Sequence, residues 1–193
     1  MRWRLFFLIL LVWGGCYFTA SFWGVHKGVL LPATYVDQSI PFLKWTLWFY
    51  VLEYTMIPVA FILIRSEENF LDMVYALLTV IVISSAIFLL FPTLMPRPEI
   101  CGESFLDAAF RLLHLVDAPT NCFPSMHVSL SVTVSVYMLR ESKILGACSF
   151  IFAFLVIIST LTTKQHYFAD ILGGFAVSWV SIQIVKYSRK LVC

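Results

Sequence analysis

Two short strings in this sequence combine histidine with side chains that bind anions or move protons. Residues 123–127 read Phe-Pro-Ser-Met-His, and His166 is followed four residues later by Asp170. A histidine four residues before an aspartate shares its helix face, so the carboxylate can accept a hydrogen bond from one ring nitrogen. The other nitrogen then keeps a lone pair that can attack an electrophile. The alternatives for this pair are an ion pair at a helix end and a metal site that includes His127.

The first string predicts the start of a helix, with Ser125 as the N-cap or a first-turn residue and His127 in the first turn. Free N–H groups and the positive end of the helix dipole bind anions at such a start. His127 beside them could give a proton to a departing oxygen. A capped helix with an interfacial histidine is the alternative interpretation.

Three further ionisable residues are candidates for the same chemistry. Arg97 stands between two prolines just outside an apolar segment, where it could bind a phosphate or anchor in lipid headgroups. Lys164 precedes His166 by two residues and could supply positive charge to a phosphate, or stay solvated in a loop. Glu53 lies within an apolar segment, where an ionisable group is a functional candidate by default, with a protonated structural role as the alternative.

The composition places these residues in a membrane protein. Hydrophobic residues make up 61% of the 193 residues and charged residues only 12%, whereas roughly a quarter of a soluble domain is charged. The net charge of +2 is spread along the chain without a basic block. Nucleic-acid binding is therefore not indicated, and the bilayer is the expected partner of a single domain over residues 1–193.

The sequence predicts an all-α fold with six transmembrane helices, because about 20 apolar residues span a bilayer core. The fourth window alternates with the period of a strand, but an open strand cannot satisfy its backbone in lipid. We therefore expect a helix there, with Ser and Thr hydroxyls bonded to preceding carbonyls. The first window also resembles a signal peptide, and we expect it to be an uncleaved helix. The six windows lie near residues 4–23, 45–64, 70–91, 124–140, 144–163 and 167–187.

The distribution of Lys and Arg predicts the orientation of these helices. Six spans put both termini on one side of the membrane and both histidine motifs on the other. The positive-inside tendency predicts cytoplasmic termini, and the histidine motifs then face the periplasm or exterior of a bacterial inner membrane. Eight of the 13 Lys and Arg residues fall on the terminal side, namely Arg2, Arg4, Arg65, Arg140, Lys143, Lys186, Arg189 and Lys190.

The long connection between the third and fourth windows is expected to hold an additional interfacial helix. Residues 105–116 place their apolar side chains on one helical face and their polar side chains on another. This helix could gate lipid entry, or be a structural helix with an ion pair between Asp107 and Arg111. Cys101 and Cys122 flank it, and they could form a disulfide or remain thiols.

Together, the six-span plan and the order of these motifs resemble the type-2 phosphatidic acid phosphatase superfamily of membrane lipid phosphatases and phosphotransferases. That family carries the patterns K-x6-R-P, P-S-G-H and S-R-x5-H-x3-D. The resemblance covers essentially the whole chain. The corresponding positions here are Arg97, residues 124–127, Ser159, His166 and Asp170.

Three positions depart from the family patterns. Leu90 stands at the lysine of the first motif, Met126 at the glycine of the second and Thr160 at the arginine of the third. Two phosphate-binding cations are therefore missing, and Lys164 could compensate. The third motif looks closer to the branch of inositol phosphorylceramide synthase-like proteins, which also lacks that arginine.

The resemblance implies metal-independent cleavage of a phosphate or pyrophosphate group of a membrane lipid, with water as the acceptor and no cofactor. His166 would be the nucleophile that forms a phosphohistidine, Asp170 its orienting partner and His127 the general acid. One alternative is transfer of the headgroup phosphate to an alcohol, and another is a non-catalytic lipid-binding membrane protein. The residues implied to hold the phosphate are Arg97, Ser125 and Lys164.

Overall fold

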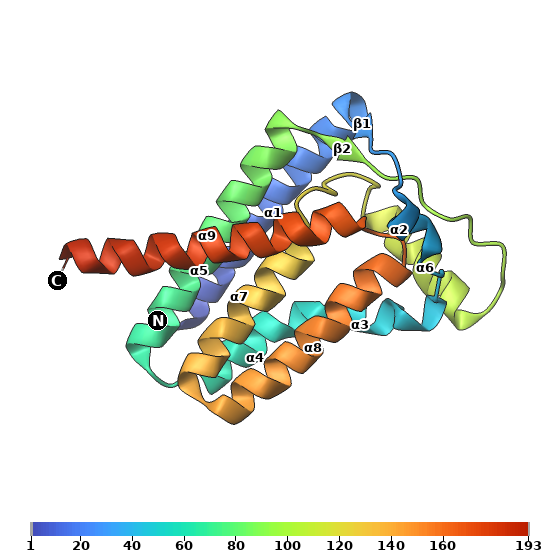
Figure 1. The fold of residues 1–193 in the computed structure, drawn as a ribbon. Helices are drawn as coiled ribbons and strands as arrows, with labels where there is room; N and C mark the ends of the chain where they lie inside the picture. Colours follow the sequence, from blue (N-terminus) through green and yellow to red (C-terminus); the bar gives the residue numbers. More distant parts are fainter. Residues whose placement is uncertain (1, 193) are drawn as a thin grey trace.

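The fold is a bundle of helices arranged around one central helix (Figure 1). The computed structural model describes residues 2–192. Its elements are α1 (Arg2–Lys27), β1 (Val29–Leu30), α2 (Tyr35–Ser39), α3 (Leu47–Leu52), α4 (Met56–Leu63), α5 (Glu67–Leu90), β2 (Thr93–Leu94), α6 (Phe105–Val116), α7 (Met126–Glu141), α8 (Lys143–Thr162) and α9 (Phe168–Val192). Helices α5, α8 and α9 pack directly against the central helix α7, and α1 packs against α5. The predicted all-α class is confirmed, with a two-residue strand pair added.

The polar residues of α7 form hydrogen bonds inside the bundle. The hydroxyl of Ser135 donates to the carbonyl oxygen of Ser131 at 2.8 Å and lies 2.8 Å from the hydroxyl of Ser149 on α8. The hydroxyls of Thr133 and Ser178 join α7 to α9 at 2.8 Å. A helix over this segment, predicted against the strand-like alternation, is therefore confirmed.

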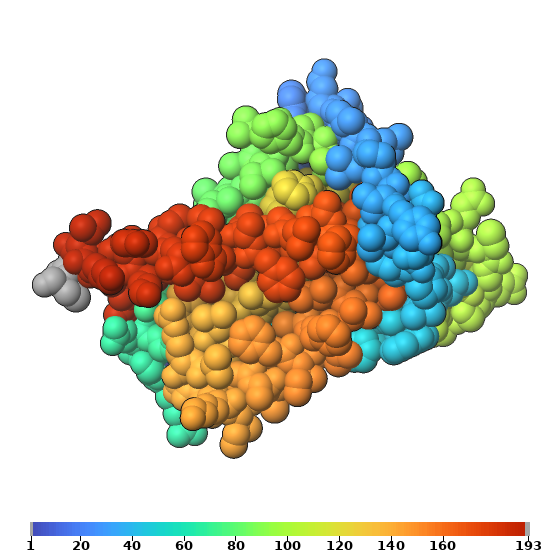
Figure 2. Space-filling view, viewed as in Figure 1, coloured from blue at the N-terminus to red at the C-terminus, as the bar shows by residue number. Residues whose placement is uncertain are grey.

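Five helices of the described chain are long and apolar enough to cross a bilayer, namely Arg2–Lys27, Lys44–Leu63, Glu67–Leu90, Lys143–Thr162 and Phe168–Leu191. The remaining predicted span, residues 124–140, forms α7, whose 16 residues extend only about 24 Å. This helix is rich in Ser and Thr and is enclosed by its neighbours, as α9 lying across the face of the bundle illustrates (Figure 2). Six crossings therefore remain a prediction.

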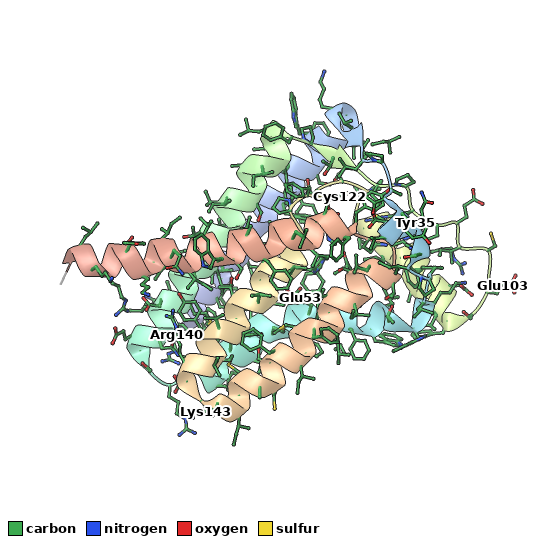
Figure 3. The ribbon with its side chains drawn as sticks, viewed as in Figure 1. Tyr35, Glu53, Glu103, Cys122, Arg140 and Lys143 are labelled. Atoms are coloured by element: carbon green, nitrogen blue, oxygen red, sulfur yellow. The ribbon has the colours of Figure 1, made fainter. Side chains whose placement is uncertain are left out.

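The second predicted span, residues 45–64, is a broken helix. A 3-10 turn at Glu53–Thr55 joins α3 to α4. Pro58 accounts for the break, because proline has no N–H and its ring clashes with the carbonyl four residues earlier, that of Tyr54. A 3-10 turn within a helix often marks a functional position. Here it holds Glu53 in the middle of the bundle, where the residue is only 2% exposed (Figure 3).

The long connections meet at one end of the bundle. Strands β1 and β2 pair in parallel and join the exit of α1 to the exit of α5. Helix α6 forms where the additional helix was expected, and its Phe110 packs against Leu47 and Tyr50. Its outer face stays exposed at Phe105 and Leu112. Its location in a membrane interface remains a prediction.

The ion pair expected within α6 is wrong. Asp107 Oδ1 instead pairs with Lys44 Nζ at 2.5 Å, while Arg111 donates to the carbonyl oxygen of Gly102 at 2.7 Å. The hydrogen bonds from Lys44 and from the Ser104 hydroxyl lower the pKa of Asp107 to about 2. Spacing along α6 could not identify Lys44, because the two partners are brought together only by packing of α6 on the start of the second span.

Ion pairs gather at the opposite end of the bundle, where Arg140 lies (Figure 3). Arg189 pairs with Asp72, and Arg140 Nη1 lies 3.9 Å from the same carboxylate. Arg2 donates to Glu67 at 2.8 Å. These contacts tie α9, α7 and α1 to the first turns of α5, so basic residues that the sequence assigned to the terminal side do share one end of the molecule.

Cys101 and Cys122 are both free thiols, so the disulfide alternative is wrong. Cys101 is exposed, whereas Cys122 is 2% exposed and its Sγ lies 3.8 Å from the carbonyl oxygen of Thr93. Burial, together with the negative charge of Asp170, raises the pKa of the Cys122 thiol to about 12. The two cysteines should therefore differ sharply in reactivity.

We expect iodoacetamide at pH 8 to modify Cys101 quickly and to leave Cys122 intact. The thiolate is the reacting form, and with a pKa of about 12 only about one Cys122 side chain in 10⁴ is ionised at that pH. Peptide mass spectrometry before and after unfolding in detergent measures both rates. Equal labelling of the two residues in the folded protein, or labelling of both only after reduction, would contradict this arrangement.

Candidate active site

His166 lies in the short turn between α8 and α9, beside the start of α7. Its backbone N–H donates to the carbonyl oxygen of Thr160 at 3.1 Å, and Lys164 adopts a left-handed φ of 56° as the chain turns back. Gly174 allows α9 to approach closely, since a Cβ there would lie 2.7 Å from the carbonyl oxygen of Ser125. The junction of α8 and α9 is thereby placed against the first turn of α7.

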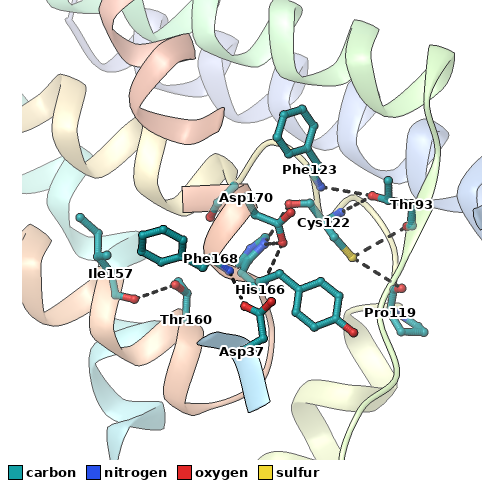
Figure 4. Close-up of polar contacts among 12 residues, drawn as sticks. Asp37, Thr93, Pro119, Cys122, Phe123, Ile157, Thr160, His166, Phe168 and Asp170 are labelled. Carbon is teal, nitrogen blue, oxygen red and sulfur yellow. Dashed lines mark hydrogen bonds and ion pairs between the residues drawn. The ribbon is translucent and has the colours of Figure 1, made fainter. Parts of the chain in front are cut away.

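The imidazole of His166 is held through its Nδ1 atom. This nitrogen lies 2.9 Å from the carbonyl oxygen of Cys122 and 3.3 Å from Asp170 Oδ2 (Figure 4). Asp170 is fully buried, and its Oδ2 also accepts the N–H of Tyr167 at 2.8 Å. Because both neighbours of Nδ1 are acceptors, we assign the ring proton to Nδ1, which leaves the lone pair on Nε2.

His127 is held in the same way by a different carboxyl group. Its Nδ1 lies 3.2 Å from Glu53 Oε2, which reaches it from the 3-10 turn between α3 and α4. The ring of Tyr50 packs against it at a centroid distance of 4.2 Å. The centroids of His127 and His166 are 5.9 Å apart, with the rings nearly perpendicular at 71°. The two imidazoles are therefore close enough to act on one group.

Both histidines line one cavity, together with Arg97. The cavity lies between the first turn of α7, the 3-10 turn and the middle of α1, at Trp13 and Tyr17. The first two residues of α7, Met126 and His127, belong to its lining. Backbone N–H groups at the start of a helix have no intrahelical acceptors, so they can bind an anion. Other lining residues with polar groups are Trp13, Tyr17, Tyr50, Glu53, Tyr54, Asp117, Thr120, Asn121 and Gln165.

Arg97 reaches this cavity with its guanidinium already bound. Nη2 lies 3.1 Å from Asp117 Oδ2 and 3.0 Å from the carbonyl oxygen of Ala118, and Nη1 donates to the carbonyl oxygen of Asp117. The hydroxyl of Tyr17 donates to Asp117 Oδ1 at 2.5 Å. The side chain of Arg97 is only 12% exposed, which does not fit an anchor in lipid headgroups. The lining thus carries one permanent cation and the two carboxyl groups of Glu53 and Asp117.

Ser125 occupies the predicted N-cap position of α7, but its hydroxyl makes no cap hydrogen bond. Its N–H donates to the carbonyl oxygen of Asp170 at 3.0 Å, which joins the start of α7 to the start of α9. The Oγ atom is buried and has no hydrogen-bond partner among residues 2–192. Ser125 itself is not among the residues that line the cavity.

Lys164 is not brought into the cavity that holds the two histidines. Its Nζ donates to the carbonyl oxygens of Asp37 and Ile40, at 2.8 and 2.5 Å, at the end of α2. Asp37 Oδ1 in turn accepts the N–H of Phe168 at 2.7 Å, at the first residue of α9. Lys164 therefore ties α2 to the turn that carries His166.

Sequence reasoning missed several lining residues. Asp117 directly follows α6 and gave no signal of its own, because its partners Arg97 and Tyr17 are 20 and 100 residues away. Tyr50 and Tyr54 did give a signal in the sequence. Both lie beside Glu53, and residues four apart on a helix share one face. Gln165 also gave a signal, because it lies within the third motif directly before His166.

The two histidines and Asp170 do not converge as a set of metal ligands. Each Nδ1 atom faces its own carboxyl group, Glu53 for His127 and Asp170 for His166. Among residues 2–192, no group of three or more His, Cys, Asp or Glu side chains is placed to hold a metal ion. The arrangement suits nucleophilic attack by one ring and proton transfer by the other.

Comparison with known proteins gives one family. A family model described as the PAP2 superfamily matches residues 31–184, which is more than half of the chain. No curated protein matches the sequence. The matched segment includes Arg97, both histidines and both of their carboxyl partners.

Proposed function

This chain belongs to the PAP2 superfamily, the type-2 phosphatidic acid phosphatases and related phosphotransferases, and we propose that it cleaves a phosphate or pyrophosphate group from a membrane lipid and passes it to water. The observation that carries the proposal is the pair of histidines that line one cavity, each with a carboxyl group at Nδ1. Five helices suited to a bilayer fit a substrate that is itself a membrane lipid.

In the first half-reaction, Nε2 of His166 attacks the phosphorus atom. The N–P bond forms as the P–O bond to the lipid breaks, and the departing oxygen takes a proton from Nε2 of His127. Asp170 and the carbonyl oxygen of Cys122 accept the Nδ1 hydrogen bond of His166. They therefore orient the ring and stabilise the positive charge that develops on it during attack.

In the second half-reaction, a water molecule attacks the phosphohistidine. His127, now neutral, takes a proton from this water, the P–N bond breaks, and its electron pair returns to Nε2 of His166. Phosphate leaves, and both rings regain their starting protonation states. Glu53 supports both steps, because a carboxyl group at Nδ1 of His127 fixes the orientation of the ring.

Charge on the phosphoryl oxygens is stabilised by Arg97 and by the first turn of α7. Met126 and His127, the first residues of α7, line the cavity, and their free N–H groups and the helix dipole take the place of the cations that are missing at Leu90 and Thr160. We assign Lys164 to holding α2, because its amine is bound to two carbonyl oxygens. The buried hydroxyl of Ser125 becomes a phosphate ligand only if the start of α7 shifts on binding.

The charge of the lining favours phosphotransfer as the second candidate function. A phosphomonoester carries a charge of about −1.5 to −2 at pH 7, whereas a phosphodiester carries a single negative charge. Arg97 is already paired with Asp117, and Glu53 adds a further carboxyl group. A monoanionic diester would therefore enter with less repulsion, and an alcohol would then replace water as the acceptor.

We also propose that α7 completes six membrane crossings, with both termini in the cytoplasm. The cavity would then open toward the periplasm or exterior of a bacterial inner membrane, in line with the basic residues at the opposite end. The exposed apolar residues of α6, among them Phe105, Leu112 and Leu115, would lie in the outer interface.

Purified protein in detergent tests the activity directly. With short-chain phosphatidic acid and excess chelator, we expect phosphate release that vanadate inhibits, and new lipid products when an alcohol acceptor is added. Activity that disappears with chelator and returns with zinc would contradict the mechanism. Release of no product from lipid monoesters, diphosphates or diesters would instead support the non-catalytic lipid-binding alternative.

Replacing Glu53 with glutamine should lower kcat by about 10- to 100-fold, a part of the roughly 10²- to 10⁴-fold that a general acid contributes. KM should change little, because Glu53 acts as a positioning residue through His127. Steady-state kinetics with a lipid phosphate measure kcat and KM separately. The matched control is Glu103→Gln, at an exposed residue in the loop before α6 (Figure 3). Equal losses in the two variants, or a change confined to KM, would contradict this role.

A further inference from the structure

A second, apolar groove lies beside the histidine cavity, between α1 and α4. It encloses about 90 Å³ and is lined almost entirely by hydrocarbon side chains. Ile9 and Ile81 are buried at its floor, while Leu10 is 42% exposed at its rim. Because α1 and α4 belong to two of the helices suited to cross a bilayer, the open side of the groove faces hydrocarbon.

The groove adjoins the histidine cavity. Four residues line both, namely Trp13, Glu53, Tyr54 and Leu130. The rings of Trp13 and Tyr54 are in edge-to-face contact, with centroids 6.1 Å apart and an interplanar angle of 67°, and they stand at the boundary between the two spaces. A larger groove of about 270 Å³ between α4, α7 and α8 shares no lining residue with the cavity.

The shared boundary lies on the side of the cavity where the leaving oxygen is protonated. Glu53 belongs to both linings and bonds His127, the proton donor in the proposed reaction. A hydrocarbon chain attached to the departing oxygen therefore leaves the cavity past Glu53 and Tyr54 and continues into the groove. Among residues 2–192, no other charged side chain lines this groove.

We propose that this groove binds the hydrocarbon chain of the substrate and that the lipid enters from the bilayer between α1 and α4, an inference that rests on the proposed phosphatase activity. The α1 side of the groove runs from Phe6 to Trp13, a rise of about 10 Å, which corresponds to about eight carbons of an extended chain. Carbons beyond that length remain in the surrounding lipid and add nothing to recognition.

A series of n-alkyl phosphates tests this inference, because the chain is attached directly to the departing oxygen. Below their micelle-forming concentrations, kcat/KM should rise by about 2- to 4-fold for each methylene from four to eight carbons, as expected for partly to fully buried methylenes. It should then level off for longer chains. If kcat/KM did not change from four to eight carbons, the groove would not be the binding site of the chain, while the proposed function would remain intact. Absence of turnover across the whole series would instead count against the proposed function.

Two neighbouring residues of α1 give a matched pair of variants. Leu10→Trp fills the rim of the groove, whereas Leu11→Trp makes the same change at a side chain that is 74% exposed and outside the groove lining. The ratio of kcat/KM for octyl over butyl phosphate should fall at least 10-fold in Leu10→Trp and stay unchanged in Leu11→Trp. If the ratio were the same in both variants, the chain would bind elsewhere.

Discussion

Replacement of His166 by asparagine is expected to reduce kcat/KM for a lipid phosphate by about 10⁴-fold or more. Asparagine can place an N–H near the position of Nδ1, so it can still donate to the carbonyl oxygen of Cys122, which lies 2.9 Å from Nδ1 in the native protein. It has no counterpart of Nε2. The variant therefore removes the attacking atom while the turn between α8 and α9 keeps its hydrogen bond.

Rapid quenching with a radiolabelled phosphate substrate separates the loss of the nucleophile from a loss of folding. The wild-type protein should carry acid-labile, alkali-stable label on histidine, and His166→Asn should carry none. His26→Asn is the matched control, because His26 is exposed and its Nδ1 also lies near a backbone carbonyl, that of Phe22 at 2.8 Å. Label in the His166 variant equal to that in the control would refute the assignment.

The features that sequence analysis predicted correctly are local along the chain. The spacing of four residues predicted that His166 and Asp170 lie within reach of each other, although His166 lies in the turn before α9 and not on the helix itself. The Ser125 N-cap follows from residue preferences at helix starts. The helix over residues 126–141 followed from the demand that every backbone group in lipid be paired. None of these inferences needs knowledge of which segments meet.

The features that were not predictable depend on contacts between distant segments. Glu53 and His127 are 74 residues apart, and their pairing requires the helix break caused by Pro58. Lys164 seemed suited to a phosphate because it shares a turn with His166, yet its amine donates to the carbonyl oxygens of Asp37 in α2 and of Ile40 just after it. This small helix was not predicted from the sequence, although Thr34 and Asp37 form its capping box. The electrostatics of the cavity are thus decided by tertiary packing, which a motif does not encode.

His127→Asn is expected to lower kcat for lipid phosphates by about 10²- to 10⁴-fold, the usual contribution of a general acid. The asparagine amide can still face Glu53, which lies 3.2 Å from Nδ1 in the native protein, but it cannot protonate the departing oxygen. An aryl phosphate needs little protonation, because its leaving group is a weak base. The first half-reaction should therefore be nearly normal with an aryl substrate.

The same variant should then stall at the second half-reaction, since water must lose a proton to His127 before the P–N bond breaks. With an aryl phosphate, His127→Asn should release about one equivalent of phenol in a burst and accumulate phosphohistidine on His166, measured by quenched flow and by mass spectrometry of the labelled peptide. His166→Asn should give no burst. Because a purely structural role for His127 would slow both half-reactions together, a slow first step without accumulated phosphoenzyme would contradict its assignment as the acid and base of the two steps.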